Sequence, residues 1–112
     1  MEEIRKLTKE IIAFRDARNW EQFHNPKDLA MALSIESAEL MELFLWKSKE
    51  ELNDVPVDKI SEELADILIY CLLLADRYDF DIVDIMKKKL SKNEKKYPVD
   101  KARGNARKYN EY

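Results

Sequence analysis

The chain has 112 residues, of which 38% are charged and 46% apolar, and its formal net charge is −3. One Gly and three Pro leave little room for a turn-rich β fold, so the composition favours a single all-α domain over residues 1–112. No apolar run approaches the roughly 18 residues that a membrane span needs, and no signal-peptide pattern opens the chain. We therefore expect no membrane partner. Because the single cysteine, Cys71, cannot form a disulfide within the chain, we also expect a reduced, cytoplasmic setting.

Apolar periodicity predicts four helices, over residues 2–18, 26–46, 57–78 and 82–96. Asn25 followed by Pro26 is typical of a helix start and begins the second helix. Ser48–Glu51 has the pattern of a capping box on a short turn, and Asp81 is placed to cap the fourth helix. Residues 98–112 have no clear period, so we expect them to be irregular.

Four carboxylates lie on helix faces from which ionised groups are normally excluded. Glu36 lies in the middle of the apolar stripe of the second helix and pairs with Glu39; that stripe consists of Leu29, Ala32, Leu33, Leu40 and Leu43. Glu63 and Asp66 lie beside the apolar stripe of the third helix, which consists of Ile60, Leu64, Ile67, Leu68 and Cys71. Residues three apart on a helix are neighbours, so each pair converges on one spot. Neither stripe contains a basic partner, and an unpaired buried carboxylate is costly. The sequence therefore predicts that these four carboxylates hold Mg²⁺, or Mn²⁺, since both cations prefer oxygen ligands.

Other kinds of catalytic site are disfavoured. Di-iron bundles typically use Glu-x-x-His motifs, and the one histidine, His24, is distant in sequence from both acidic pairs. The same argument disfavours catalytic zinc. Cys71 lies in an apolar helical run, which disfavours a nucleophilic role for its thiol.

The second and third helices are apolar on a further side as well. The residues concerned are Ala30, Met31, Ala38, Met41 and Leu45, followed by Ala65, Ile69 and Leu73. A helix that is apolar on most sides is buried on most sides. In a chain this short, we therefore expect a homo-oligomer that packs through these helices, with a patchy monomer surface as the alternative.

Charge is distributed unevenly along the chain. Residues 85–112 carry ten Lys or Arg and three acidic residues, whereas residues 1–84 carry ten Lys or Arg and twenty acidic residues. A basic end combined with an acidic cluster suggests a polyanionic ligand bridged to a metal, and a solvated basic helix and tail is the alternative. The basic region has no recognised nucleic-acid-binding motif, so nucleic acid is not the expected partner.

Aromatic residues flank the second helix. Trp20, Phe23 and His24 lie in the loop before it, Trp46 lies near its predicted end, and Tyr70 follows Asp66 by one turn. A loop tryptophan could stack on a flat base, or it could close the end of a helical bundle. The residues alone favour the second interpretation.

Taken together, these groups resemble the all-α, MazG-like nucleoside triphosphate pyrophosphohydrolases, and within them the dCTP-pyrophosphatase branch. The matching stretches are Phe14-Arg15-Asp16, Trp20-Glu21-Gln22-Phe23-His24, Asn25-Pro26, Glu36-x-x-Glu39-Leu40, Leu43 to Lys47, Glu62 to Tyr70, Lys89 to Asn93, Lys96-Tyr97-Pro98 and Ala102 to Tyr109. The broader family often has a second Glu before the first motif, where this chain has Ile35, so a fifth carboxylate is not expected.

The resemblance implies a four-helix MazG-like bundle that assembles as a dimer or a dimer of dimers, with residues 97–112 as a basic tail. It implies Mg²⁺-dependent cleavage of a nucleoside triphosphate, such as dCTP or a modified pyrimidine dNTP, to the monophosphate and pyrophosphate, as nucleotide-pool house-cleaning. The catalytic and metal-binding residues would be Glu36, Glu39, Glu63 and Asp66. The substrate-binding residues would be Trp20, His24, Trp46 and Tyr70 around the base and sugar, and Lys89, Asn93, Tyr97 and Arg103 at the phosphates.

Two alternatives stay open at this stage. One is a related pyrophosphatase that acts on dUTP or phosphoribosyl-ATP. The other is a non-catalytic helical module for nucleotide binding or protein interaction, in which the carboxylates bind metal only structurally.

Overall fold

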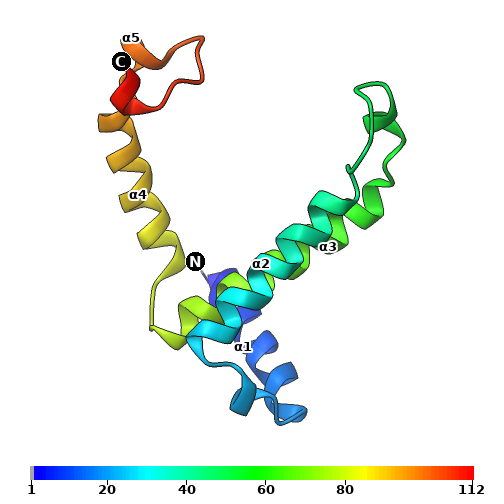
Figure 1. The fold of residues 1–112 in the computed structure, drawn as a ribbon. Coiled ribbons are helices and arrows are strands. Elements are labelled where there is room, and N and C mark those ends of the chain that lie inside the picture. Colours follow the sequence, from blue (N-terminus) through cyan, green and yellow to red (C-terminus); the bar gives the residue numbers. More distant parts are fainter. Residues whose placement is uncertain (1) are drawn as a thin grey trace. The chain divides into compact units, whose positions relative to one another are not determined.

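The computed structural model describes residues 2–112, and every regular element within this range is helical (Figure 1). The α-helices are α1 (Glu2–Ala17), α2 (Pro26–Glu42), α3 (Val57–Arg77), α4 (Ile82–Lys96) and α5 (Val99–Ala102). Short 3₁₀ turns are η1 (Glu21–Phe23), η2 (Glu51–Asp54) and η3 (Tyr109–Glu111). The prediction of an all-α protein is therefore confirmed. None of the helices within the described range combines the length and the apolar character needed to span a membrane.

The helix starts have the caps that the sequence predicts. The backbone N–H of Asp28 donates to Asn25 Oδ1 at 2.9 Å, and that of Asp84 donates to Asp81 Oδ1 at 3.0 Å. In the segment Ser48–Glu51, the serine hydroxyl accepts the glutamate N–H at 3.3 Å and donates to its carboxylate at 3.0 Å. Each cap satisfies a backbone donor that the helix itself leaves without a partner.

Two sequence predictions of helix extent were wrong. Helix α2 ends at Glu42 rather than near Trp46, and Trp46 has a φ of +64°, which an α-helix does not contain. Residues 98–112 are not wholly irregular, because they contain α5 and η3. A turn at Gly104, with a φ of +81°, separates these two elements, and glycine adopts this conformation without a Cβ clash.

The chain forms two compact units, which meet in sequence between Asp79 and Phe80. In the first unit, α2 and α3 run side by side and α1 packs against α3 (Figure 1). The centre of its core consists of Ile11, Leu29 and Leu73, one residue from each helix, and Leu29 is only 2% exposed. Burial of one such side chain contributes about 1.5–3 kcal/mol.

The inward face of α3 differs from the face that periodicity predicts. Leu64 and Leu68 were placed in the inward stripe, but they are 48% and 54% exposed. Leu73 was placed on the opposite side, but it is 5% exposed and lies in the core. The physical reason is that α3 packs against both α1 and α2, so its buried face lies between the two predicted stripes.

The second unit consists of α4 and the segment that follows it. The Tyr97 ring makes edge contacts with Tyr109 and Tyr112, with centroid distances of 6.1 and 6.0 Å. The Lys96 ammonium lies 5.0 Å from the centroid of the Tyr109 ring. These contacts fold the C-terminal segment back onto the end of α4, which explains why η3 forms in a stretch without helical periodicity.

Candidate functional site

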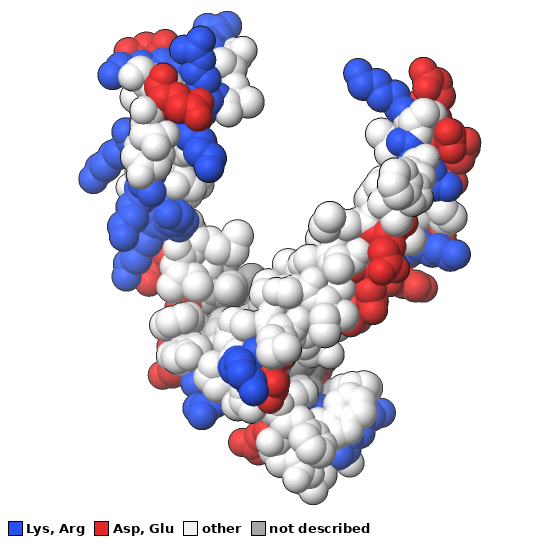
Figure 2. All heavy atoms as spheres, in the orientation of Figure 1, with Lys and Arg blue, Asp and Glu red and all other residues white. Residues whose placement is uncertain are grey.

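Three of the four predicted carboxylates come together between α2 and α3. Glu36, Glu39 and Glu63 each offer an oxygen atom, and these atoms all lie within 4.8 Å of one another. All three side chains are half-buried. The i, i+3 spacing places the first two on one face of α2, and the side-by-side packing of α3 brings in the third. Acidic side chains gather on the visible face of the α2–α3 pair (Figure 2).

Asp66, the fourth predicted carboxylate, lies at the edge of this cluster. It is exposed and is not one of the three groups whose oxygen atoms converge within 4.8 Å. Its negative charge nevertheless helps to raise the pKa of both Glu36 and Glu63, so it is an electrostatic neighbour of the cluster.

The negative charge of the cluster is not balanced by an ion pair with any Lys or Arg that the structure describes. Burial raises the pKa of the Glu36 carboxyl to about 7, and the neighbouring carboxyl groups of Glu39, Asp66 and Glu63 add to the increase. Burial also raises the pKa of Glu63. One oxygen of Glu36 and one of Glu63, Oε2 in each case, is buried without a hydrogen-bond partner. Within residues 2–112, no Lys or Arg forms an ion pair with these carboxylates.

This set of donors fits a hard divalent cation. All the available ligand atoms are carboxylate oxygens, which suits Mg²⁺ or Mn²⁺. A cation would also partner the two buried oxygens that otherwise lose their hydration without compensation.

Tyr70 links the core of the first unit to the acidic cluster. It is half-buried and packs against the core formed by Ile11, Leu29 and Leu73. Burial raises the pKa of its phenol, and the nearby charges of Glu36, Asp66 and Glu39 raise it further. Tyr70 therefore stays protonated at neutral pH, as a hydrogen-bond donor beside the carboxylates.

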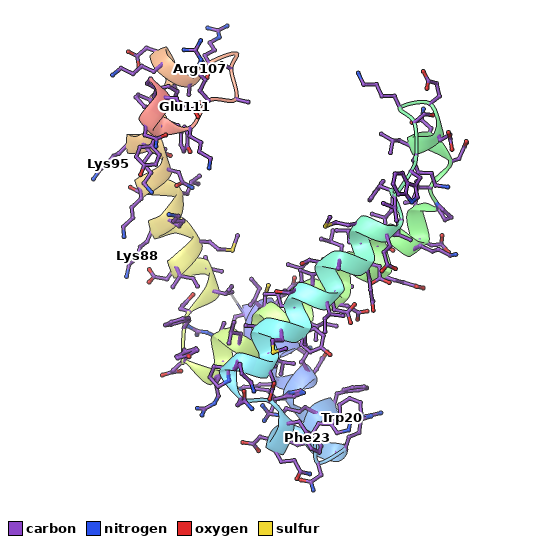
Figure 3. The ribbon with its side chains drawn as sticks, viewed as in Figure 1. Trp20, Phe23, Lys88, Lys95, Arg107 and Glu111 are labelled. Carbon is purple, nitrogen blue, oxygen red and sulfur yellow. The ribbon has the colours of Figure 1, made fainter. Side chains whose placement is uncertain are left out.

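The loop between α1 and α2 carries Trp20 and Phe23, as labelled in Figure 3. Trp20 meets Phe14 edge-on at a centroid distance of 5.9 Å and is 43% exposed, so it does not close the end of the core. His24 is half-buried, and its Nδ1 is buried without a hydrogen-bond partner. Burial lowers the pKa of His24, and the positive charge of Arg15 lowers it further.

Trp46 lies in the turn after α2 and is 91% exposed, with its backbone in the left-handed region. A large aromatic side chain with so little contact to its own chain is available to a ligand or a partner.

The other predicted site residues, Lys89, Asn93, Tyr97 and Arg103, belong to the second unit. Lys89 and Arg103 are exposed, whereas Asn93 is half-buried. Lys and Arg side chains gather along α4 in Figure 2. Their role as substrate-binding residues stays a prediction.

The sequence analysis includes Arg15 in a matching stretch but assigns it no role, although its side chain is only 13% exposed in the last turn of α1. The signal available in the sequence was an arginine three residues after an apolar position of α1, Ile12, directly before the aromatic loop. Its burial depends on how the loop folds back, which no local pattern encodes.

Comparison with known proteins places this geometry in context. Residues 31–112 match the model of the MazG-like family. The chain is similar to dCTP pyrophosphatase 1 from Mus musculus, with 43% identity over 97% of this chain and 65% of the mouse protein. It is 41% identical to dCTP pyrophosphatase 1 from Homo sapiens, over 99% of this chain and 66% of the human protein. The chain thus spans slightly less than two thirds of the length of these relatives.

A solved structure of another protein is similar to this chain in fold. A pyrophosphatase from Archaeoglobus fulgidus superposes with a TM-score of 0.81 at 41% sequence identity, covering 86% of this chain and 93% of that chain.

Proposed function

Because this chain belongs to the MazG-like family, we propose that it is a metal-dependent nucleoside triphosphate pyrophosphohydrolase. The proposed substrate is dCTP or a modified pyrimidine dNTP, since the relatives named above are dCTP pyrophosphatases. The products are the nucleoside monophosphate and pyrophosphate. The proposed role is clearance of unwanted nucleotides from the cytoplasmic pool.

The observation that carries this proposal is the uncompensated carboxylate cluster on α2 and α3. Glu36, Glu39 and Glu63 converge there, with two buried oxygens that have no partner. We propose that these three residues and Asp66 hold Mg²⁺ or Mn²⁺. When bound, such a cation supplies charge neutralisation to the phosphates and lowers the pKa of a coordinated water.

The residues of the chain would act mainly by orientation. The carboxylates would hold the cation that neutralises the polyphosphate, and the protonated Tyr70 phenol beside them would be available as a hydrogen-bond donor. Positioning and electrostatic stabilisation account for most of the catalysis in phosphoryl transfer. Without a cation, burial and the neighbouring carboxyl groups raise the pKa of Glu36 to about 7, whereas a bound divalent cation would favour its ionised form.

The base and sugar would lie against aromatic side chains. Trp20 leaves 43% of its surface exposed and Trp46 leaves 91%, so both have faces on which a base can stack. His24 and Tyr70 would supply polar contacts to the nucleotide. We propose that Lys89, Asn93, Tyr97 and Arg103 contact the phosphates, because the unit that carries them is basic.

We also propose that the protein is a dimer or a dimer of dimers. Large apolar side chains of α2 are exposed, among them Met31 at 55%, Ile35 at 56% and Met41 at 71%. Met31 and Ile35 also line an apolar depression at the start of α2. Soluble monomers seldom expose apolar surface of this extent, so a second copy is the expected cover.

Product analysis with a panel of dNTPs, with and without Mg²⁺, tests the proposed function. We expect metal-dependent formation of the monophosphate and pyrophosphate, fastest with a pyrimidine substrate. Release of orthophosphate with a diphosphate would contradict cleavage between the α and β phosphates.

The rival function is a non-catalytic nucleotide-binding module, because a metal in the cluster could serve stability alone. In that case, Mg²⁺ would raise the Tm while no nucleotide is consumed at the same metal concentration. Turnover of dUTP or phosphoribosyl-ATP in preference to dCTP would instead indicate a related pyrophosphatase.

A further inference from the structure

Arg15 is the most buried charged side chain around the aromatic loop, and the catalytic proposal assigns it no role. Its side chain is 13% exposed. Its Nε donates to Asp16 Oδ1 at 2.9 Å, and its Nη2 lies 2.9 Å from the same oxygen. The arginine head is therefore fixed by a two-point contact, which a lysine could not reproduce.

The loop is attached to Arg15 at two places. The backbone N–H of Trp20 donates to the Arg15 carbonyl at 3.2 Å, and the Arg15 Nη2 lies 4.0 Å from Glu21 Oε2. The main chain and the side chain of one residue thus connect the end of α1 to the start of η1. Trp20 is itself one end of this connection and His24 follows Glu21 by three residues; Figure 3 shows Trp20 and Phe23 on the loop after α1.

His24 is the loop residue on which Arg15 acts electrostatically. Its Nδ1 is buried without a hydrogen-bond partner, a state that normally costs free energy unless a ligand or water supplies the bond. Burial lowers the pKa of His24, and Arg15 is the charged residue that lowers it further. The other charged residues within eight positions of His24 along the chain are Asp16, Arg18, Glu21, Lys27 and Asp28.

Most of those other groups have partners of their own. Arg18 stacks 3.6 Å from the centroid of the Phe14 ring, and Lys27 lies 3.6 Å from Asp28.

A neutral imidazole has one nitrogen that accepts a hydrogen bond and one that donates, whereas the imidazolium only donates. A nearby fixed positive charge therefore preserves the form that can accept.

We propose that Arg15 is a positioning residue, which ties the Trp20–His24 loop to α1 and keeps the unpartnered Nδ1 of His24 available to the bound nucleotide. This inference rests on the proposed function, because it assigns the ligand of the loop to the base or sugar of a nucleotide. Arg15 itself touches neither the metal cluster nor the reacting phosphates in this proposal.

Because His24 is the only histidine in the chain, its imidazole resonances give an unambiguous NMR probe in the full-length protein. In Arg15→Gln, we expect the pKa of His24 to rise toward its ordinary value, since one of its two causes is removed and burial is retained. The control is Lys9→Gln, which removes an equal charge from the exposed side of α1 and should leave the His24 titration unchanged. An unchanged titration in Arg15→Gln overturns the proposal.

The second measurement is binding of dCMP, a nucleotide that the enzyme would not consume, followed through the same His24 resonances. We expect Arg15→Gln to weaken dCMP binding roughly five- to tenfold, the effect of about one hydrogen bond. For turnover of dCTP, KM should rise by a similar factor while kcat changes by less than about twofold. Native affinity for dCMP in this variant overturns the proposal.

Arg15→Lys serves as a second variant, in case the glutamine variant does not fold. It keeps the charge, so the His24 titration should match the native protein, but it loses the two-point contact with Asp16. We expect dCMP affinity between those of the native and Gln proteins, and native affinity in Arg15→Lys overturns the positioning role. A native protein that turns over no nucleotide refutes the proposed function, whereas an active native protein with unaltered Arg15 variants refutes this inference alone.

Discussion

The carboxylates of Glu36 and Glu63 come from two different helices, yet they converge within 4.8 Å, and each buries an oxygen without a hydrogen-bond partner among residues 2–112. Two such groups repel one another when both are ionised, which is why burial and neighbouring carboxyls raise the pKa of Glu36 to about 7. The protein folds with these two mutually repelling carboxylates although few apolar side chains are fully buried in its core. Such a local cost is expected at a functional site, where the missing partner is a ligand.

Glu63→Gln should reduce dNTP turnover by roughly 100-fold or more, because loss of one metal ligand removes several kcal/mol of transition-state stabilisation. The helical circular dichroism spectrum should be unchanged. The matched control is Glu62→Gln, since Glu62 is the adjacent acidic residue and is exposed. Near-native activity in Glu63→Gln, or an equal loss in Glu62→Gln, would contradict the assignment of the cluster.

Without metal, the stability of the protein should decrease as pH rises from about 4.5 to about 7. The folded state retains a proton on Glu36 in this window, whereas the unfolded chain has released it, so the unfolding free energy falls with pH. Thermal unfolding in a chelator at several pH values measures the slope. Glu36→Gln should flatten it, and an identical slope in that variant would show that another group is responsible.

Addition of Mg²⁺ should raise the Tm at pH 7.5 and reverse the loss of stability described above. A ligand that binds only the folded state stabilises it by RT ln(1 + [L]/Kd), so the Tm should increase with metal concentration. The increase should be absent in Glu36→Gln/Glu63→Gln. A metal-induced shift of the same size in that double variant would place the metal elsewhere.

Trp46→Ala should raise the KM for the nucleotide roughly 5- to 100-fold, since stacking of a base on an aromatic ring contributes about 1–3 kcal/mol. Because Trp46 is 91% exposed, the variant should unfold at nearly the native temperature. Trp46→Phe retains a flat ring and should recover most of the affinity. Unchanged KM in Trp46→Ala would remove this residue from the nucleotide site.

Met41→Lys should shift the protein toward monomers in analytical ultracentrifugation, because it places a charge on the apolar face of α2, where Met41 is 71% exposed. Glu42→Lys is the control, as it introduces a lysine at the next, already polar position. If both variants sediment like the native protein, the face that carries Met41 is not the contact between copies.

Leu29→Ala should destabilise the first unit by about 2–5 kcal/mol, since Leu29 is 2% exposed and packs with Ile11 and Leu73. Chemical denaturation of the metal-free protein measures this change. Val57→Ala, at a position 78% exposed, should alter the unfolding free energy by less than about 0.5 kcal/mol. Similar losses in the two variants would show that Leu29 is not central to the core.

The sequence was a good guide where the determining interactions are local. The caps at Asn25 and Asp81 form as predicted, because each depends on one side chain and a backbone N–H three residues later. The convergence of Glu36 with Glu39 also follows from helix geometry. The early end of α2 was missed because the N–H groups of Leu43, Phe44 and Leu45 bond to carbonyls three residues earlier rather than four, and apolar periodicity does not reveal this tighter turn.

By itself, the sequence determined the all-α class, the limits of α3 and α4 to within a residue, and the pairing of Glu36 with Glu39 on α2. Only the tertiary structure decided that Glu63 joins Glu36 and Glu39 while Asp66 stays at the edge. It alone decided that Leu73 rather than Leu68 enters the core, and that the Arg15 side chain is left only 13% exposed beside the aromatic loop. The physical reason is that periodicity fixes the angle between side chains on one helix, whereas the rotation of each helix about its axis depends on all the helices that pack against it.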